Sequence, residues 1–347
     1  MVQSSLSVII PNYNHSSYLP DILNSILDQS YKPLEIIVID DGSTDNSIEV
    51  LESFAKKNKQ IRLYQNDQNK GVIFTANRGL ELTKGEYVCF IASDDEVMPC
   101  FFEKSISLLK IHPKAGLCSA KLKTIDENGK IICVVPVKSI SDKECFMPPN
   151  ETLKLLIRHG AWMAGPTVIY RRDACLEAGG LIPELYGFCD VFLDMVIALK
   201  HGACFIPTVL AAQRQLSSSY SANFRSNLEM LIRSYSHAAY LMQTRYAELF
   251  PPNFLKSWKD QQLYHARLST TKRLQKQQIS IMKSILKKEK FIDRIFFSGL
   301  HASMRIQFLA LISYLFLRLG RRLWPVLERG LLTVFRRIET SVGFRRK

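Results

Sequence analysis

The sequence lacks several patterns that would assign it to common protein classes. Its eight cysteines include no Cys-x-x-Cys pair, which argues against a zinc site or a disulfide framework. No glycine-rich dinucleotide fingerprint follows the first predicted strand, which disfavours a nicotinamide-dependent dehydrogenase. The first residues, MVQSSLSVIIP, lack a basic region followed by a long apolar run, so we expect no secretory signal. Together these absences predict a cytoplasmic location with reduced thiols.

Acidic residues become scarce toward the C-terminus, which concentrates the positive charge there. The formal net charge of the 347 residues is +14. Nine of those net charges lie from Lys290 onward, where twelve Lys and Arg residues accompany three acidic ones. The basic residues are interspersed with Leu, Phe and Trp, and no helix-turn-helix or aromatic-basic sheet pattern accompanies them. We therefore expect no nucleic-acid partner.

The basic tail also lacks an apolar run long enough to cross a bilayer. Residues 306–317 form an uncharged stretch of twelve residues, whereas a spanning helix needs roughly 20. Flanking arginines, with Trp324 and Phe335, are typical of a helix at an anionic membrane surface, here the inner face of the cell membrane. The pattern equally fits an amphipathic helix that packs on its own domain or on a second copy in a homo-oligomer. Both alternatives stay open.

Short β-branched runs alternate with helical patterns in the first part of the chain. SLSVIIP and LEIIVID are typical of buried parallel strands, and Leu19, Ile22 and Ile26 lie between them at helical spacing. The alternation continues through IRLYQN, VIFTANRGLELT, EYVCFIAS and FFEKSISLLKIHP. This order predicts an α/β fold, Rossmann-like, with a mostly parallel sheet and helices on both faces.

The later segments predict a change of organisation. A strand ending in the turn DENGK, the strand TVIYRR, a helix over residues 190–201 and the strand ACFIPTVLA continue the first domain, and we interpret SISDKECFMPPN as a loop. From about Ser217 the chain shows long helical patterns with little glycine. We therefore expect a domain of residues 1–216 and a helical, basic C-terminal region of residues 217–347.

Polar residues follow the ends of three predicted strands. The first strand leads into Pro11 and Tyr13, the second into Asp41, and the fourth into Asp94 and Asp95. Ligands bind at the carboxyl ends of strands in an open parallel sheet, so we expect one pocket there. Tyr13 is suited to stacking on a base and Asp41 to accepting a hydrogen bond from a pyrimidine or ribose. DDGSTDNS alone also fits a turn that caps the next helix.

Asp94 and Asp95 are adjacent carboxylates directly after an apolar strand. Such a pair repels itself unless a cation is present, and a divalent ion that joins it to a diphosphate would relieve the repulsion. Acidic pairs are also common in surface turns. Their expected place on the same edge as Asp41 favours the metal and phosphate interpretation.

These segments match one known family. SVIIPNYNHSSYLPDILNSILDQSYKPLEIIVIDDGSTDNS and NKGVIFTANRGLELTKGEYVCFIASDDEVMP closely resemble the nucleotide-sugar domain of family 2 glycosyltransferases, which has the GT-A fold. The resemblance covers about residues 5–215. It implies inverting transfer from a nucleotide-diphosphate sugar, most often a UDP-sugar, to a hydroxyl of a glycan or lipid-linked acceptor. The cofactor would be Mn²⁺ or Mg²⁺, and the pathway would be cell-surface or extracellular glycan assembly.

The resemblance also implies roles for single residues. Pro11 and Tyr13 would line the base pocket, and Asp41 would hold the uracil or its equivalent. Asp95 would be the principal metal ligand, and Asp94 would lie nearer the ribose as a second contact to the metal.

Two further residues fall in the second half of the resemblance. In YGFCDVFLDMVIALKHG, Asp190 stands where the family has its catalytic base, and Asp194 one turn later is a weaker candidate. Arg214 falls where relatives often have a basic residue on a flexible loop over the diphosphate. We expect Asp190 to take the acceptor proton and Arg214 to bind the donor.

The chain departs from the family pattern at three positions. Ala92 occupies the place of a leading acidic residue, and Cys189 replaces the Glu before Asp190. Ala76 stands where relatives often carry Arg, which makes the nearby Arg78 a candidate donor contact. These departures leave a second interpretation, a non-catalytic nucleotide-sugar-binding or scaffold protein of the same fold.

Overall fold

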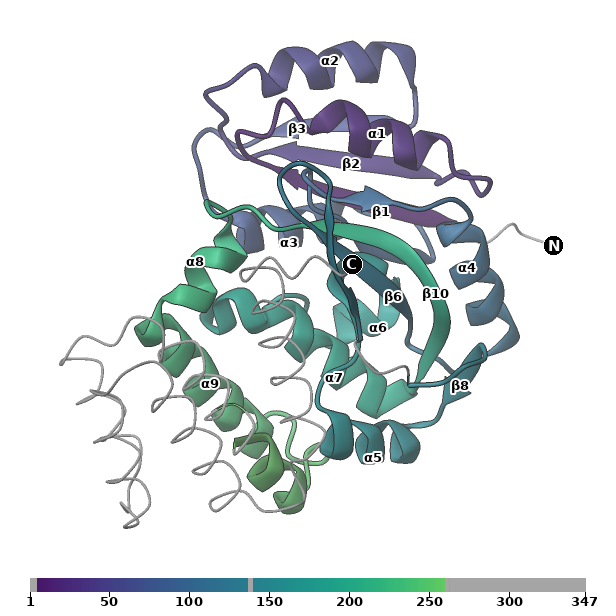
Figure 1. Ribbon diagram of the computed structural model, residues 1–347, viewed down its shortest axis with the longest axis vertical. Helices are drawn as coiled ribbons and strands as arrows, with labels where there is room; N and C mark the ends of the chain where they lie inside the picture. The colour runs from purple at the N-terminus through teal and green to yellow at the C-terminus, as the bar shows by residue number, and fades with distance from the viewer. Residues whose placement is uncertain (1–4, 137–139, 260–261, 263–347) are drawn as a thin grey trace, which may run out of the picture. The chain divides into compact units, whose positions relative to one another are not determined.

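The computed structural model describes residues 5–136, 140–259 and 262 (Figure 1). The basic tail and residues 306–317 lie outside the described residues. Among the residues that are described, no helix is both long and apolar enough to cross a membrane. All eight cysteines are free thiols.

The chain forms two compact units. The first comprises residues 1–156 and 161–251, and the second comprises residues 157–160 and 252–347. The expected domain boundary near residue 216 falls inside the first unit, between a strand and the helix that follows it, and stays a prediction. The strands of the sheet and the candidate site described below belong to the first unit.

The N-terminal half of the sheet is a parallel array joined by helices. Strand β1 pairs in parallel with β2 and β4, and β2 pairs in parallel with β3. The elements are β1 (Leu6–Asn12), α1 (Leu19–Leu27), β2 (Glu35–Asp40), α2 (Ser47–Lys57), β3 (Ile61–Gln65), α3 (Val72–Leu82) and β4 (Tyr87–Phe90). Apart from α2, each lies where the alternation of apolar patterns predicts it.

The C-terminal half of the sheet is mixed. Strands β6 and β10 run parallel to each other, whereas β9 lies antiparallel between β4 and β6, and β5, β7 and β8 are antiparallel additions. The elements are β5 (Glu96–Val97), α4 (Phe101–Ile111), β6 (Leu117–Ile125), β7 (Ile131–Val135), β8 (Cys145–Met147), α5 (Pro149–His159), η1 (Gly165–Thr167), β9 (Ile169–Arg171), α6 (Arg172–Glu177), η2 (Pro183–Phe188), α7 (Cys189–His201), β10 (Ala203–Arg214), α8 (Tyr220–Ser226) and α9 (Leu228–Gln243).

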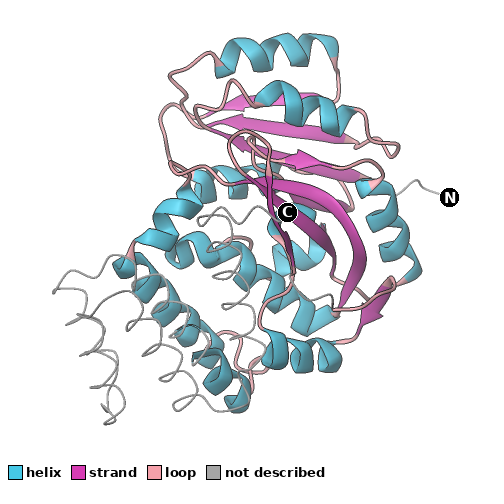
Figure 2. Cartoon of the chain, in the orientation of Figure 1, coloured by secondary structure: helices cyan, strands magenta, loops and turns pink. Residues whose placement is uncertain are grey.

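The strand order is β3-β2-β1-β4-β9-β6-β10-β5, with β7 beside β6 and β8 beside β10. The predicted α/β fold, with a mostly parallel sheet and helices on both faces, is confirmed (Figure 2). The interpretation of SISDKECFMPPN as a loop is wrong in part. Residues 145–147 form β8, which pairs antiparallel with β10, and α5 begins at Pro149.

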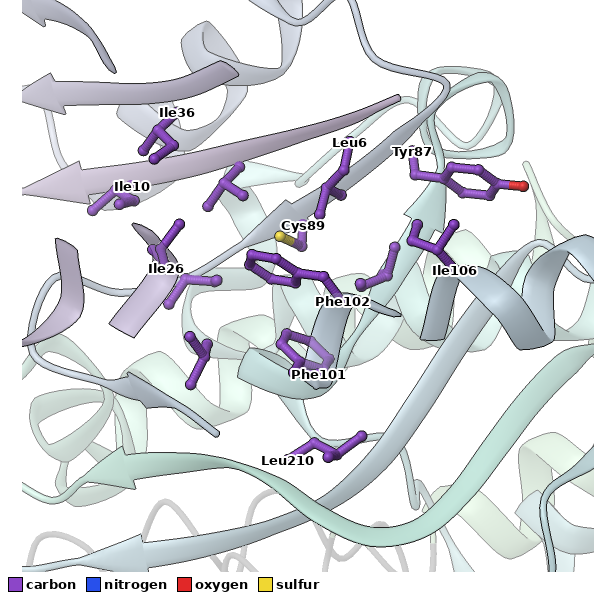
Figure 3. Packing of buried hydrophobic residues seen from close by; sticks show 14 of the residues in the cluster. Leu6, Ile10, Ile26, Ile36, Tyr87, Cys89, Phe101, Phe102, Ile106 and Leu210 are labelled. Carbon is purple, nitrogen blue, oxygen red and sulfur yellow. The ribbon is translucent and has the colours of Figure 1, made fainter. Parts of the chain in front are cut away.

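Alternate residues of β1 pack into cores on opposite faces of the sheet. Leu6, Val8 and Ile10 belong to a cluster of fully buried side chains with α1 and α4 (Figure 3). Ile9 points to the other face, where α3 approaches so closely that Gly79 lies directly over it. The same face carries α7, because the Tyr170 hydroxyl of β9 donates a hydrogen bond of 2.7 Å to Asp194.

A methyl group at Gly79 would test this close approach. An ideal Cβ there would lie 2.3 Å from Cγ2 of Ile9. We expect Gly79→Ala to lower the free energy of unfolding by about 1–3 kcal/mol, although alanine favours a helix by about 1 kcal/mol. Urea unfolding followed by circular dichroism measures the change, with Glu52→Ala on the exposed face of α2 as control. A Gly79→Ala protein as stable as the wild type would contradict the packing.

Candidate active site

The ends of β1 and β2 are locked together by side chains. Asn12 Nδ2 donates to Asp40 Oδ2 at 2.8 Å, and Asp40 also accepts from the backbone N–H and the hydroxyl of Ser43. The backbone N–H of Asp41 donates to the Asn12 carbonyl at 2.8 Å. This network fixes the turn after β2, so the direction of the Asp41 side chain is set by both strands.

Asp41 holds the loop that precedes α3. Its carboxylate accepts from Asn66 Nδ2 at 2.6 Å and from the backbone N–H groups of Lys70 and Gly71 at 2.9 and 2.8 Å. The side chain is buried. A carboxylate has about four acceptor positions, so about one remains for a ligand.

Arg78 contributes to the position of the Asp41 carboxylate indirectly, through Asn66. Its guanidinium donates to Asn66 Oδ1 and to the carbonyl of Gln65, and lies over the ring of Tyr64. The amide of Asn66 is thereby oriented with its nitrogen toward Asp41. Sequence reasoning missed Asn66, although it directly follows β3 and the same strand-end signal that selected Asp41 could have found it.

Pro11 and Tyr13 lie where the sequence predicts them, at and just beyond the end of β1. The side chain of Tyr13 is 41% exposed at this edge of the sheet. Asn14 has a positive φ of 55° and accepts from the backbone N–H of Thr44, which turns the chain after Tyr13. The ring is therefore open for stacking by a planar group.

Arg214 fastens the acidic segment between β4 and β5. Its backbone N–H donates to Asp95 Oδ1 at 3.0 Å, its Nε donates to the Asp94 carbonyl at 3.1 Å, and its guanidinium pairs with Glu96 at 2.8 Å. The guanidinium also donates to the carbonyls of Asp126 and Glu127. Arg214 is buried at the last position of β10, so it is a fixed element of the site.

Asp94 and Asp95 are buried carboxylates under electrostatic strain. Burial raises the pKa of Asp94, and His15 and Arg214 oppose this in part. Burial, followed by the charge of Asp94, raises the pKa of Asp95 well above its usual range. Two hard oxygen donors whose charges repel each other fit a divalent cation of the Mg²⁺ or Mn²⁺ type. Within the described residues no group of three or more His, Cys, Asp or Glu side chains is arranged to hold a metal.

Asp190 lies in the first turn of α7. Its Oδ1 accepts from the Val191 N–H at 2.7 Å, and burial raises its pKa. Gly165 faces its other oxygen, because a Cβ built on Gly165 would come within 3.4 Å of Asp190 Oδ2. No hydrogen bond joins Asp190 to Asp41, Asp94 or Asp95 among the residues described here.

Asp194, the weaker candidate, is engaged elsewhere. It is fully buried and accepts the hydrogen bond from Tyr170. Burial raises its pKa well above the usual range, and Asp190 adds to the shift. The arrangement points to a structural role for the Asp194 carboxyl.

The raised pKa of Asp194 predicts that the stability of the folded protein depends on pH. The pKa of Asp194 is higher in the folded state than in the unfolded chain, so between these two pKa values the folded state binds more protons than the unfolded chain. The folded protein therefore loses stability as the pH rises through this interval. Asp194→Asn keeps an oxygen that can accept from Tyr170 and removes the titration. We expect the melting temperature of Asp194→Asn to rise relative to that of the wild type as the pH increases from about 4, the ordinary range of an aspartate, upward. A constant difference would contradict the raised pKa.

Removal of Arg214 tests how the acidic segment is held. Arg214→Met leaves Glu96, the buried Asp94 carbonyl and two further carbonyls without their donor, so we expect the free energy of unfolding to fall by about 2 kcal/mol. Arg233→Met is the matched control, because Arg233 forms an exposed pair with Glu229 and such pairs contribute little. Equal stability of the two variants in urea unfolding would show that Arg214 does not fasten the segment.

Two of the solved structures that share this fold contain a nucleotide sugar. TarS of S. aureus, crystallised as residues 1–349 with UDP-GlcNAc, superposes with a TM-score of 0.53 at 17% identity, over 89% of this chain and 90% of that chain. The mannosyltransferase PcManGT from Pyrobaculum calidifontis, in complex with GDP-Man and Mn²⁺, gives a TM-score of 0.51 at 17% identity, over 91% and 89% of the two chains. At these identities the likeness establishes the fold, which is of the GT-A type.

Sequence comparison identifies the family of the N-terminal part. An uncharacterized glycosyltransferase, YibD of Escherichia coli (strain K12), is 32% identical over 179 residues, which are 50% of this chain and 50% of that relative. The match therefore spans half of the relative's length. Residues 7–174 match the family model described as "Glycosyl transferase family 2". The strand ends that carry Asp41, Asp94 and Asp95 thus belong to a family 2 glycosyltransferase domain.

Proposed function

We propose that the protein transfers a sugar from a nucleotide-diphosphate donor, a UDP-sugar, to a hydroxyl acceptor with inversion. The observation that carries the proposal is the buried pair Asp94–Asp95, fastened by Arg214 at the edge of the sheet that also bears Asp41. TarS, which has the same fold, was crystallised with UDP-GlcNAc. The acceptor would belong to cell-surface or extracellular glycan assembly, as the family resemblance implies.

The nucleoside would bind at the ends of β1 and β2. Pro11 and the exposed ring of Tyr13 supply an apolar face for the base, and the free acceptor position of Asp41 suits an imide N–H. Arg78 contributes indirectly, since it orients the Asn66 amide that holds Asp41. Asp94 would lie toward the ribose.

Asp95, with Asp94, would hold Mn²⁺ or Mg²⁺ beside the diphosphate. When bound, the cation supplies charge neutralisation for the departing nucleoside diphosphate. PcManGT was solved with GDP-Man and Mn²⁺. Because one oxygen of Asp95 accepts from the Arg214 N–H, its other oxygen is the one available to a metal. Arg214 is therefore assigned the role of positioning Asp95.

Asp190 would act as the general base. The acceptor oxygen forms a bond to the anomeric carbon, the bond from that carbon to the diphosphate oxygen breaks with its electron pair, and the acceptor proton passes to the Asp190 carboxylate. One displacement of this kind inverts the anomeric centre. A carboxyl whose pKa is raised by burial is a stronger base than an exposed one, which suits the role.

The alternative is a nucleotide-sugar-binding protein without turnover, which Ala92 and Cys189 favour. Calorimetric UDP binding with no sugar release in the presence of Mn²⁺ would support it. Association of the basic tail with anionic membrane, or with a second copy of the chain, stays a prediction about residues outside the described part.

Two substitutions separate chemistry from donor binding. We expect Asp190→Asn to lower the rate of sugar transfer or donor hydrolysis by about 10²–10⁴-fold, with UDP affinity unchanged. Asp95→Asn should weaken the stimulation by Mn²⁺ as well as the rate. Release of UDP from a panel of UDP-sugars measures both, with Asp142→Asn in a surface loop as control. Wild-type rates in Asp95→Asn and Asp190→Asn would refute the proposed function.

A further inference from the structure

A groove of about 810 Å³ runs along the outer face of α3, apart from the acidic pair. One side is formed by α3 and the residues just before it, and the other by η2 and the start of α8. Its lining includes Lys70, Phe74, Glu81, Tyr186 and Tyr220. None of the acidic strand-end residues lines it, so the proposed donor chemistry leaves the groove unexplained.

The groove combines half-exposed rings with hydrogen-bonding groups. Phe74 is 48% exposed and Tyr220 is 39% exposed, which is unusual for large apolar rings on neighbouring elements. Glu81 is exposed and forms no ion pair within the described part of the chain. Aromatic faces stack on the C–H faces of sugar rings, while carboxylate and phenol oxygens bind sugar hydroxyls. This pairing of surfaces matches a carbohydrate.

The charges favour a neutral carbohydrate over an anionic one. Lys70 is paired with Asp67 at 2.7 Å and also lies over the ring of Phe74. Arg78 donates from Nη1 to the Gln65 carbonyl and to the Asn66 amide oxygen. Lys70 is paired with an acidic residue, and the negative Glu81 lies in the same lining as Arg78, so the groove offers an incoming phosphate or carboxylate little net positive charge.

Tyr186 reaches the groove at a conformational cost. Its backbone has φ 49° and ψ −134°, a combination that residues other than glycine seldom adopt. The next residue, Gly187, is packed against α8, since a Cβ there would lie 2.7 Å from Cδ1 of Phe224. The contact of η2 with α8 thus holds Tyr186 in a backbone conformation that favours glycine. This strained conformation places an aromatic ring at the groove.

Both ends of the groove adjoin the proposed active site. Lys70 and Gly71 are the residues whose N–H groups bind Asp41. Tyr186 precedes Asp190 by one turn of chain that leads directly into α7. Burial, followed by the neighbouring Cys189 and Tyr186, raises the pKa of the Tyr220 phenol to about 12.

We propose that this groove binds the acceptor as a neutral oligosaccharide, with Phe74, Tyr186 and Tyr220 as its stacking surfaces. The proposal rests on the proposed function for its link to transfer, but the binding itself is independent of turnover. It assigns to α3 a second role beside its packing on the sheet.

Saturation-transfer NMR on the full chain with UDP and Mn²⁺ tests the groove. Cellotetraose, chitotetraose and mannotetraose serve as neutral probes and tetragalacturonate as the anionic one. We expect a neutral probe to bind the wild type, and Phe74→Ala and Tyr220→Ala to weaken it about fivefold or more. Tyr186→Gly relieves the backbone and should fold well, yet lose the same binding. Tyr240→Ala, a 60% exposed ring on α9, is the matched control.

The outcomes separate this proposal from the donor site. No binding of any neutral probe, unchanged binding in the groove variants, or tighter binding of tetragalacturonate would overturn the groove assignment. A thermal shift with UDP reports the donor site on the same samples. Glycan binding without UDP binding would support the groove as a carbohydrate site and contradict the proposed function. UDP binding, with glycan binding unchanged in the groove variants, would contradict the groove assignment alone.

Discussion

The parallel register of β1 with its two neighbours is the constraint on which the site depends. Asn12 pairs with Asp40 across β1 and β2, and Ile9 pairs with Phe90 across β1 and β4. Because the three strands run in one direction, the chain segments that leave them emerge at the same edge of the sheet. A shift of one residue would turn the apolar side chains of β1 to the wrong faces, so the same packing that forms the cores also fixes the polar edge.

The negative charge at that edge is partly offset by Arg214, which lies on a strand from the other half of the sheet. Asp94, Asp95 and Glu96 are consecutive, and Arg214 at the end of β10 contacts each of them through a backbone or side-chain atom. Burial raises the pKa of both aspartates, the charge of Asp94 adds to the shift at Asp95, and the Arg214 guanidinium opposes these effects only in part. Under the proposed function, the residual charge favours a cation there even though Ala92 supplies no third carboxylate.

Local patterns predicted the parallel half of the fold and the strand-end residues, because helical spacing and β-branched runs depend only on residues that are close in sequence. Strand β8 was missed since three residues carry no periodicity and pairing with β10 decides their conformation. Arg214 was expected on a flexible loop, but its burial depends on carbonyls more than eighty residues away in sequence. The positive φ of Tyr186 likewise leaves no local signal, because its cause is the packing of η2 on α8.

The most direct test of the account is the location of a metal and nucleotide on the protein. Crystals grown with UDP and MnCl₂ can be examined by anomalous diffraction at the manganese edge. The account predicts one anomalous peak in contact with the Asp95 oxygen that Arg214 leaves free, with the base beside Tyr13 and Asp41. A peak elsewhere, or UDP bound away from the ends of β1 and β2, would contradict it.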